Sequence, residues 1–265
     1  MSLDRYLDDQ LARGRAWFSR DEALRALGAS PAALAAALTR LVGKHRLANP
    51  RHGFYLILRP EDRAAGAPDP ARWIDPLMKH QGIDYRVSLL SAAALHGASH
   101  QAAMAFQVIV PRQLRELALG RHRLQFITQA SAAFGQCNRP QWLAQMKTDA
   151  GYAKAAGVEL ALLDCARYFH RAGGIGSVAQ VAKDLGAKAG ARRLAALARA
   201  FENSSVRRLG YLLELAGHEP QAKALEPFAR KAKSVKLLDP ASREAPGATS
   251  GRWRIAVNFP VEFDA

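Results

Sequence analysis

The chain has 265 residues, of which 49% are hydrophobic, and its formal net charge is +15 at pH 7. This length and apolar content are enough for one large or two ordinary domains with real hydrophobic cores. The two cysteines, Cys137 and Cys165, match no metal-binding spacing and suit a reducing compartment. We find no signal-peptide pattern and no apolar run near the ~20 residues of a membrane helix. We therefore expect a soluble cytoplasmic protein with no membrane partner and a preference for polyanions.

The first sixty residues predict helices followed by a hairpin. The leucine spacing indicates a helix over residues 3–13. Ser19 and Glu22 have the spacing of a capping box, and the helix that they open should end at Gly28, which tolerates a left-handed conformation. Ser30, followed by a proline, has the signature of a new helix start. Two helices joined by so short a turn are typical of helix-turn-helix modules.

The helix that begins near Ser30 has two different faces. Leu34 and Leu38 lie on the side that should pack inward. The opposite side is rich in alanine, and its only obvious hydrogen-bonding groups are Thr39 and Arg40, with Lys44 at the border. Such small side chains permit close approach to a DNA groove and contact with thymine methyl groups. Much of the affinity would then come from phosphate contacts and depend strongly on salt.

A hairpin with a basic tip is expected after this helix. Strand-like runs at 46–48 and 54–58 flank the turn-forming segment 49–53, which carries two basic side chains. The sequence therefore predicts a winged helix-turn-helix DNA-binding domain over residues 1–60. Its candidate DNA contacts are Arg20, Ser30, Thr39, Arg40, Lys44, Arg46, Arg51 and His52.

The rest of the chain predicts a linker and a second, larger domain. Residues 61–72 are polar, contain prolines and show no periodicity, which indicates a linker. Residues 73–265 predict a mixed α/β domain with a small sheet and a helical portion, so the expected fold class of the chain is α+β. The expected helices cover 73–79, 88–97, 160–168, 177–185, 192–201 and 206–215, and the expected strands cover 106–110, 123–128 and 252–258.

No residue pattern predicts catalysis, a cofactor or a metal site. His96 and His100 are one helical turn apart, but Gly97 should end the helix between them and the glutamate of a metalloprotease helix is missing. The glycines at 173–176 match neither nucleotide-binding loop and are expected to form a flexible connection between helices. The acidic residues are scattered, whereas a metal-dependent nuclease needs them clustered. We therefore expect a protein that is not an enzyme.

Basic charge is not confined to the predicted DNA-binding domain. Lysine and arginine outnumber acidic residues by seven to two over residues 20–60, six to one over 110–147, and twelve to five over 183–236. The two later regions either contact nucleic acid or form an arginine-rich solvated surface, and the sequence leaves both interpretations open.

Segments that are far apart in the chain share their pattern with a known family. They are Phe18–Ala23 with Gly53–Tyr55, Tyr85–Gln101, Gln107–Pro111, Arg207–Glu214 and Trp253–Asn258. Tyr85–Gln101 is the most specific of them. On these residues the chain resembles, over nearly its whole length, the AbiEi family, the antitoxin-repressors of type IV toxin–antitoxin (abortive infection) systems, which act in phage defence.

The resemblance implies a repressor that binds inverted repeats in its own promoter through the N-terminal domain. It also implies that residues 73–265 counteract a nucleotidyltransferase toxin of the AbiEii type, without requiring a stable complex. The Gly-Ser and paired-Asp signature of that toxin is missing here, so the chain resembles the antitoxin partner. Two alternatives stay open: a plain winged-helix regulator with no toxin, and a nucleic-acid-processing enzyme targeted by a winged helix. The operator sequence and the choice between monomer and dimer on DNA also stay open.

Overall fold

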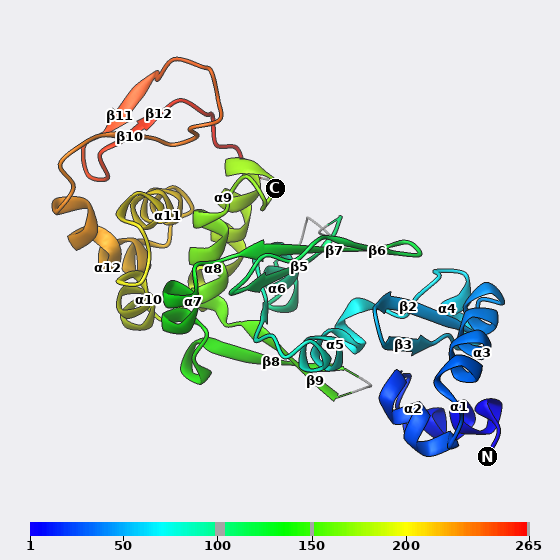
Figure 1. Cartoon of the computed structure of the whole chain (residues 1–265). Helices are drawn as coiled ribbons and strands as arrows, with labels where there is room; N and C mark the ends of the chain where they lie inside the picture. The colour runs from blue at the N-terminus through cyan, green and yellow to red at the C-terminus, as the bar shows by residue number, and fades with distance from the viewer. Residues whose placement is uncertain (99–103, 149–150, 264–265) are drawn as a thin grey trace.

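The structure is a computed structural model that describes residues 1–98, 104–148 and 151–263. Over these residues it contains three sheets and twelve α-helices, which bury three hydrophobic cores. Figure 1 shows an elongated molecule with the N-terminal helices at one end, a six-stranded sheet in the middle, and helices with a small sheet at the other end.

Residues 1–58, called the N-terminal unit below, combine three helices with a three-stranded antiparallel sheet. In chain order its elements are α1 (Leu3–Ala12), β1 (Trp17–Ser19), α2 (Arg20–Leu27), α3 (Pro31–Gly43), β2 (Leu47–Arg51) and β3 (Phe54–Ile57), and β3 is the central strand. The predicted capping box is present, because the Ser19 hydroxyl accepts from the Glu22 amide while the Glu22 carboxylate accepts from the Ser19 amide. Gly28 ends α2 with a φ of 61°, and the chain bends by 119° into α3. No pattern in the sequence predicted strand β1.

The segment expected to be a linker is packed against the rest of the chain. It contains α4 (Pro60–Arg63) and a 3-10 turn, η1 (Pro70–Arg72). The Ala65 carbonyl accepts from the Arg121 amide at 2.8 Å, and the Pro68 carbonyl accepts from the Trp73 indole at 2.9 Å. A proline has no backbone N–H to donate, but its carbonyl can accept a hydrogen bond, as that of Pro68 does. The two bonds fix the segment to the sheet and the helix that follow it.

The middle of the molecule is a mixed six-stranded sheet in the order β6-β7-β5-β4-β9-β8. Its strands are β4 (Arg86–Val87), β5 (Phe106–Val110), β6 (Leu117–Leu119), β7 (His122–Thr128), β8 (Leu143–Thr148) and β9 (Gly151–Ala156). Of these, the sequence predicted β5 and β7, which pair in parallel. Along β5, Val108 and Val110 enter one core and Ile109 enters another, as the two-residue period of a strand requires.

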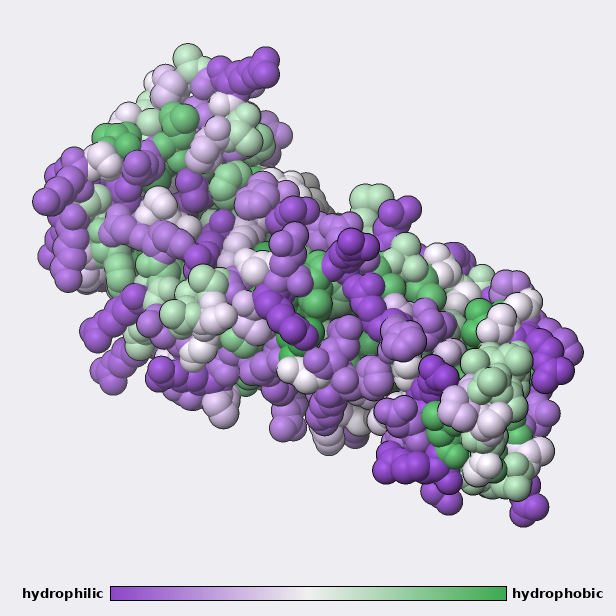
Figure 2. Space-filling model, viewed as in Figure 1, coloured by the Kyte–Doolittle hydropathy of each residue, from purple (hydrophilic) through white to green (hydrophobic). Residues whose placement is uncertain are grey.

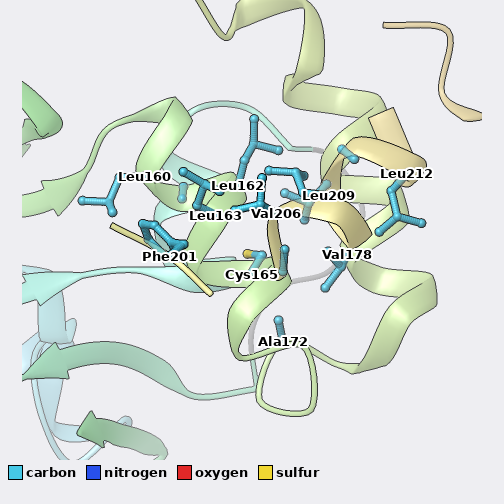
Figure 3. Close-up of a cluster of buried hydrophobic side chains, with 14 of the residues drawn as sticks. Leu160, Leu162, Leu163, Cys165, Ala172, Val178, Phe201, Val206, Leu209 and Leu212 are labelled. Atoms are coloured by element: carbon cyan, nitrogen blue, oxygen red, sulfur yellow. The ribbon is translucent and has the colours of Figure 1, made fainter. Parts of the chain in front are cut away.

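Helices cover this sheet and continue beyond it. They are α5 (Ile74–His80), α6 (Leu89–Leu95), α7 (Ser131–Cys137), α8 (Val158–Arg167), α9 (Gly174–Leu185), α10 (Ala191–Ala198), α11 (Asn203–Leu215) and α12 (Glu219–Arg230), with short 3-10 turns η2 (Pro140–Trp142) and η3 (Gly186–Lys188). Every residue of α8 from Glu159 to Ala166 is buried, and Figure 3 shows its leucines packed with side chains of α9 and α11. The glycines at 174 and 176, expected in a flexible connection, instead lie in the first turn of α9.

A separate three-stranded sheet lies beside α11 near the end of the chain. Its strands are β10 (Lys236–Leu237), β11 (Ala248–Ser250) and β12 (Ile255–Val257), with β12 in the centre. The second part of the chain therefore carries two sheets, where the sequence predicted one small sheet. Among all the described residues of the chain, no single helix is long and apolar enough to cross a membrane. Only the bent pair α2 and α3, taken together, meets the same criteria of length and composition.

Candidate nucleic-acid interface

Helix α3 presents an exposed outer face of small and basic residues. The residues that the sequence placed on or beside this face are all exposed: Ala32, Ala33, Ala36, Thr39, Arg40, Gly43 and Lys44. The Thr39 hydroxyl donates to the Ala35 carbonyl at 3.0 Å, which leaves its lone pairs free to accept. Figure 2 shows pale green and white atoms at this end of the molecule, bordered by purple. The opposite face of α3 buries Leu34 and Leu38 in the core of the unit, as predicted.

Two predicted contacts, Arg20 and Ser30, meet at the start of α3, which Ser30 caps and which the Arg20 side chain reaches from the first residue of α2. The Ser30 hydroxyl caps α3 by accepting from the Ala33 amide at 3.2 Å. The Arg20 side chain is half-buried, and one of its nitrogens lies 3.4 Å from the Pro31 carbonyl that it donates to. The Arg20 bond therefore links α2 to the start of α3, whereas Ser30 caps α3 and stays exposed.

Arg46, Arg51 and His52 have different surroundings from the residues on α3. Arg46 forms an exposed ion pair with Asp4 of α1. Arg51 donates to the Arg115 carbonyl at 2.5 Å and lies over the Phe126 ring, so its side chain is engaged with the second part of the chain. Burial, and then the nearby charge of Arg115, lower the pKa of the Arg51 guanidinium. The His52 side chain is exposed in the two-residue turn between β2 and β3.

The segment of the chain with the most specific sequence pattern forms a buried ion pair. Two nitrogens of Arg86 donate to the two oxygens of Asp164, both at 3.0 Å, and both side chains are fully buried. The Ser88 hydroxyl donates to Asp164 at 2.7 Å, and Gln129 accepts from Arg86 at 2.8 Å. This network ties β4 to α8 across the sheet. Ser88 was predicted to begin α6, but its hydroxyl caps no helix and serves Asp164 instead.

A second group of patterned residues holds the small C-terminal sheet on α11. Arg207 donates to the carbonyls of Ser234 and Arg254, and Arg208 donates to that of Leu238. A Cβ atom at Gly210 would lie 2.1 Å from the Trp253 ring, so only glycine allows the tryptophan to pack there. Two of the twelve basic residues counted over 183–236 are thus buried structural groups rather than part of a basic surface.

Glu214, the last residue of the family-like segment 207–214, also holds the small C-terminal sheet on α11. Glu214 accepts from the Trp253 indole nitrogen and forms an ion pair with Arg252 at 2.8 Å. Residues 207–214 and 252–254 are far apart in the sequence and meet only in the fold. The residues of this region that resemble the family therefore pack the small C-terminal sheet against α11.

The structure places both cysteines and one histidine of the candidate metal pair. Cys137 and Cys165 are buried, and burial raises the pKa of both thiols, which disfavours the nucleophilic thiolate. No three histidine, cysteine or acidic side chains gather as metal ligands among residues 1–98, 104–148 and 151–263. His96 is hydrogen-bonded to the Ala156 carbonyl at 2.8 Å, and His100 lies outside the described residues.

Comparison with known proteins defines the class. Residues 86–215 match the family model described as the AbiEi antitoxin C-terminal domain. That segment contains the buried network around Arg86 and all of α11, so this part of the chain is the C-terminal domain of an antitoxin from a toxin–antitoxin system. Residues 86–215 therefore belong to the AbiEi antitoxin family.

One solved structure shares the fold over almost the whole chain. The crystal structure of the Rv2827c protein from Mycobacterium tuberculosis is similar with a TM-score of 0.71 at 17% sequence identity, over 96% of this chain and 90% of that one. At this identity the likeness shows the fold alone. No curated protein sequence matches the chain.

Proposed function

We propose that this antitoxin is a DNA-binding autorepressor of a type IV toxin–antitoxin system. Residues 1–58 would act as a winged helix-turn-helix that places α3 in the major groove of inverted repeats in its own promoter. The observation that carries this proposal is the outer face of α3, where Thr39 and Arg40 are exposed among small residues. The 119° bend between α2 and α3 lies within the range of helix-turn-helix modules.

The chemistry of this face favours a division of labour between neighbouring basic residues. Arg40 stands among the alanines, where its planar guanidinium is suited to a guanine edge. Lys44 follows the last helical residue and borders the face, where a point charge is suited to a phosphate. Ser30 caps the other end of α3, where the Arg20 side chain reaches from α2, and both residues are proposed to contact the DNA backbone.

The second part of the proposal concerns the toxin. We propose that the domain of residues 73–265 counteracts a nucleotidyltransferase toxin of the AbiEii type, encoded beside this chain. The buried Arg86, Arg207 and Arg208 serve the fold, so we assign the antitoxin role to exposed side chains of this domain. A test is to express the full chain and its neighbouring toxin together, using the Arg40→Ala variant to weaken DNA binding. Rescue of growth by this variant is expected, and loss of rescue would contradict separate roles.

The division of labour on α3 gives a measurable prediction. Arg40→Ala should cost about 1–3 kcal/mol on the operator and much less on random DNA, because a base contact is lost. Lys44→Ala should weaken both DNAs alike and lower the slope of log affinity against log salt by about 0.9, because one phosphate contact is lost. Fluorescence anisotropy at four salt concentrations measures both. Arg243→Ala, in an exposed loop at the far end of the molecule, is the control. Equal losses on operator and random DNA for both variants would refute the assignment.

A further inference from the structure

The tip of the β2–β3 hairpin is hydrogen-bonded to the second part of the chain. Arg51, at the end of β2, donates to the Arg115 carbonyl and lies 5.8 Å from the centre of the Phe126 ring. In the turn itself, the His52 carbonyl is 3.2 Å from the imidazole Nε2 of His80 in α5. The hairpin thus has hydrogen bonds to two separate segments of the following domain, one from the end of β2 and one from the turn.

Apolar packing continues across the same contact. Phe54 is completely buried, with its ring stacked on Trp17 and 5.4 Å from that of His80. The hairpin side chains Leu56 and Leu58 belong to the core that also contains Leu77 and the strands of the large sheet, not to the core of the N-terminal unit. Figure 1 shows the hairpin between α3 and α5. One face of the hairpin is therefore part of the second domain's core.

This arrangement differs from what a DNA-reading hairpin needs. Such a hairpin must project into solvent so that its basic tip reaches phosphates or the minor groove. Here the guanidinium of Arg51 is directed to a protein carbonyl and an aromatic ring, and burial of apolar surface holds the strand below it. Arg115 and Arg51 are neighbouring cations, so an anion between them is the competing interpretation, and the test must separate the two.

We infer that Arg51 and His80 are positioning residues that lock the hairpin tip to the second domain, and thereby fix the orientation of α3, rather than contacts to DNA. The inference rests on the proposed function only for its consequence at the operator. The lock itself is a property of the free protein. α3 would then make the main contacts with the bases of the operator. Its orientation would be fixed relative to the second domain, instead of being left free by a flexible linker.

The lock is tested first in the absence of DNA. Arg51→Met keeps the apolar stem over Phe126 and removes the donors, and His80→Phe keeps a ring beside Phe54 and removes the bond to His52. Both variants should increase amide hydrogen exchange about tenfold in residues 76–82 and 112–119, since each loses one interdomain hydrogen bond. Arg51→Lys, which still donates, should restore much of the protection. Unchanged exchange in both variants would overturn the lock.

The second measurement asks whether Arg51 contacts phosphate. The salt dependence of operator binding by the full-length Arg51→Met variant should keep the wild-type slope, whereas Lys44→Ala should lower that slope by about 0.9 without altering exchange at 76–82 or 112–119. A slope lowered by about 0.9 in Arg51→Met would overturn the inference and identify an anion-binding pair of arginines. Absence of operator binding by the wild type would refute the proposed function while the exchange result still decides the lock.

Discussion

Replacing Asp164 with alanine should lower the free energy of unfolding by about 3–5 kcal/mol, which is the expected cost of breaking a buried ion pair. The carboxylate accepts from two nitrogens of Arg86 and from the Ser88 hydroxyl, and both charged side chains have no exposed surface. The variant would leave a guanidinium buried without its counter-charge. Urea unfolding followed by far-ultraviolet circular dichroism measures the loss at constant m value.

The matched control is an exposed ion pair of the same domain. Arg171 and Glu116 are 4.0 Å apart, with about half or more of each side chain exposed, so Glu116→Ala should change stability by less than about 1 kcal/mol. The double variant Arg86→Met with Asp164→Leu removes both charges and should recover most of the loss. If Asp164→Ala unfolds at the same urea concentration as Glu116→Ala, the network does not hold β4 to α8.

The second large effect is expected at Gly210. A methyl group there would lie 2.1 Å from the Trp253 ring, closer than any real contact, so Gly210→Ala must displace the tryptophan. Trp253 is fully buried and its indole nitrogen donates to Glu214, so we expect destabilisation of about 3 kcal/mol. Trypsin should then cut faster within residues 230–254, because the small sheet loses its attachment to α11.

Gly247 provides the control for this substitution. It lies in the loop before β11 with an ordinary backbone conformation, and a methyl group added there would meet no atom within 4 Å, so Gly247→Ala should be close to neutral. Equal protease resistance of Gly210→Ala and the native chain would show that Trp253 does not anchor the small sheet.

The N-terminal unit was predictable because its signals are local. Ser19, Glu22, Gly28 and Ser30 each act on backbone groups within four residues, so a single sequence is sufficient to place α2 and α3. The exposed face of α3 followed from its helical period alone. The sequence also predicted the hairpin. It did not predict the contacts of the hairpin tip, because the partner residues lie 28 and 64 positions away in the sequence.

The second part of the chain was less predictable because its partners are distant in the sequence. Arg86 and Asp164 are separated by 78 residues, and no spacing rule joins them. Strand β9 reads Gly-Tyr-Ala-Lys-Ala-Ala, which lacks the β-branched residues that marked β5, and its pairing with β8 and β4 determines it. The expected linker at 61–72 is polar by composition, but its carbonyls have partners in the fold.

The central claim is that the outer face of α3 reads the major groove of this chain's own promoter. Dimethyl sulfate protection reports the guanine N7 atoms of that groove directly. The full-length protein should protect guanines in two inverted half-sites upstream of its gene. Ala36→Glu, which adds a negative charge to the exposed face without touching the core, should abolish the protection and leave the unfolding curve unchanged. Protection that persists in the folded Ala36→Glu variant, or its absence from the upstream DNA of the wild type, would contradict the claim.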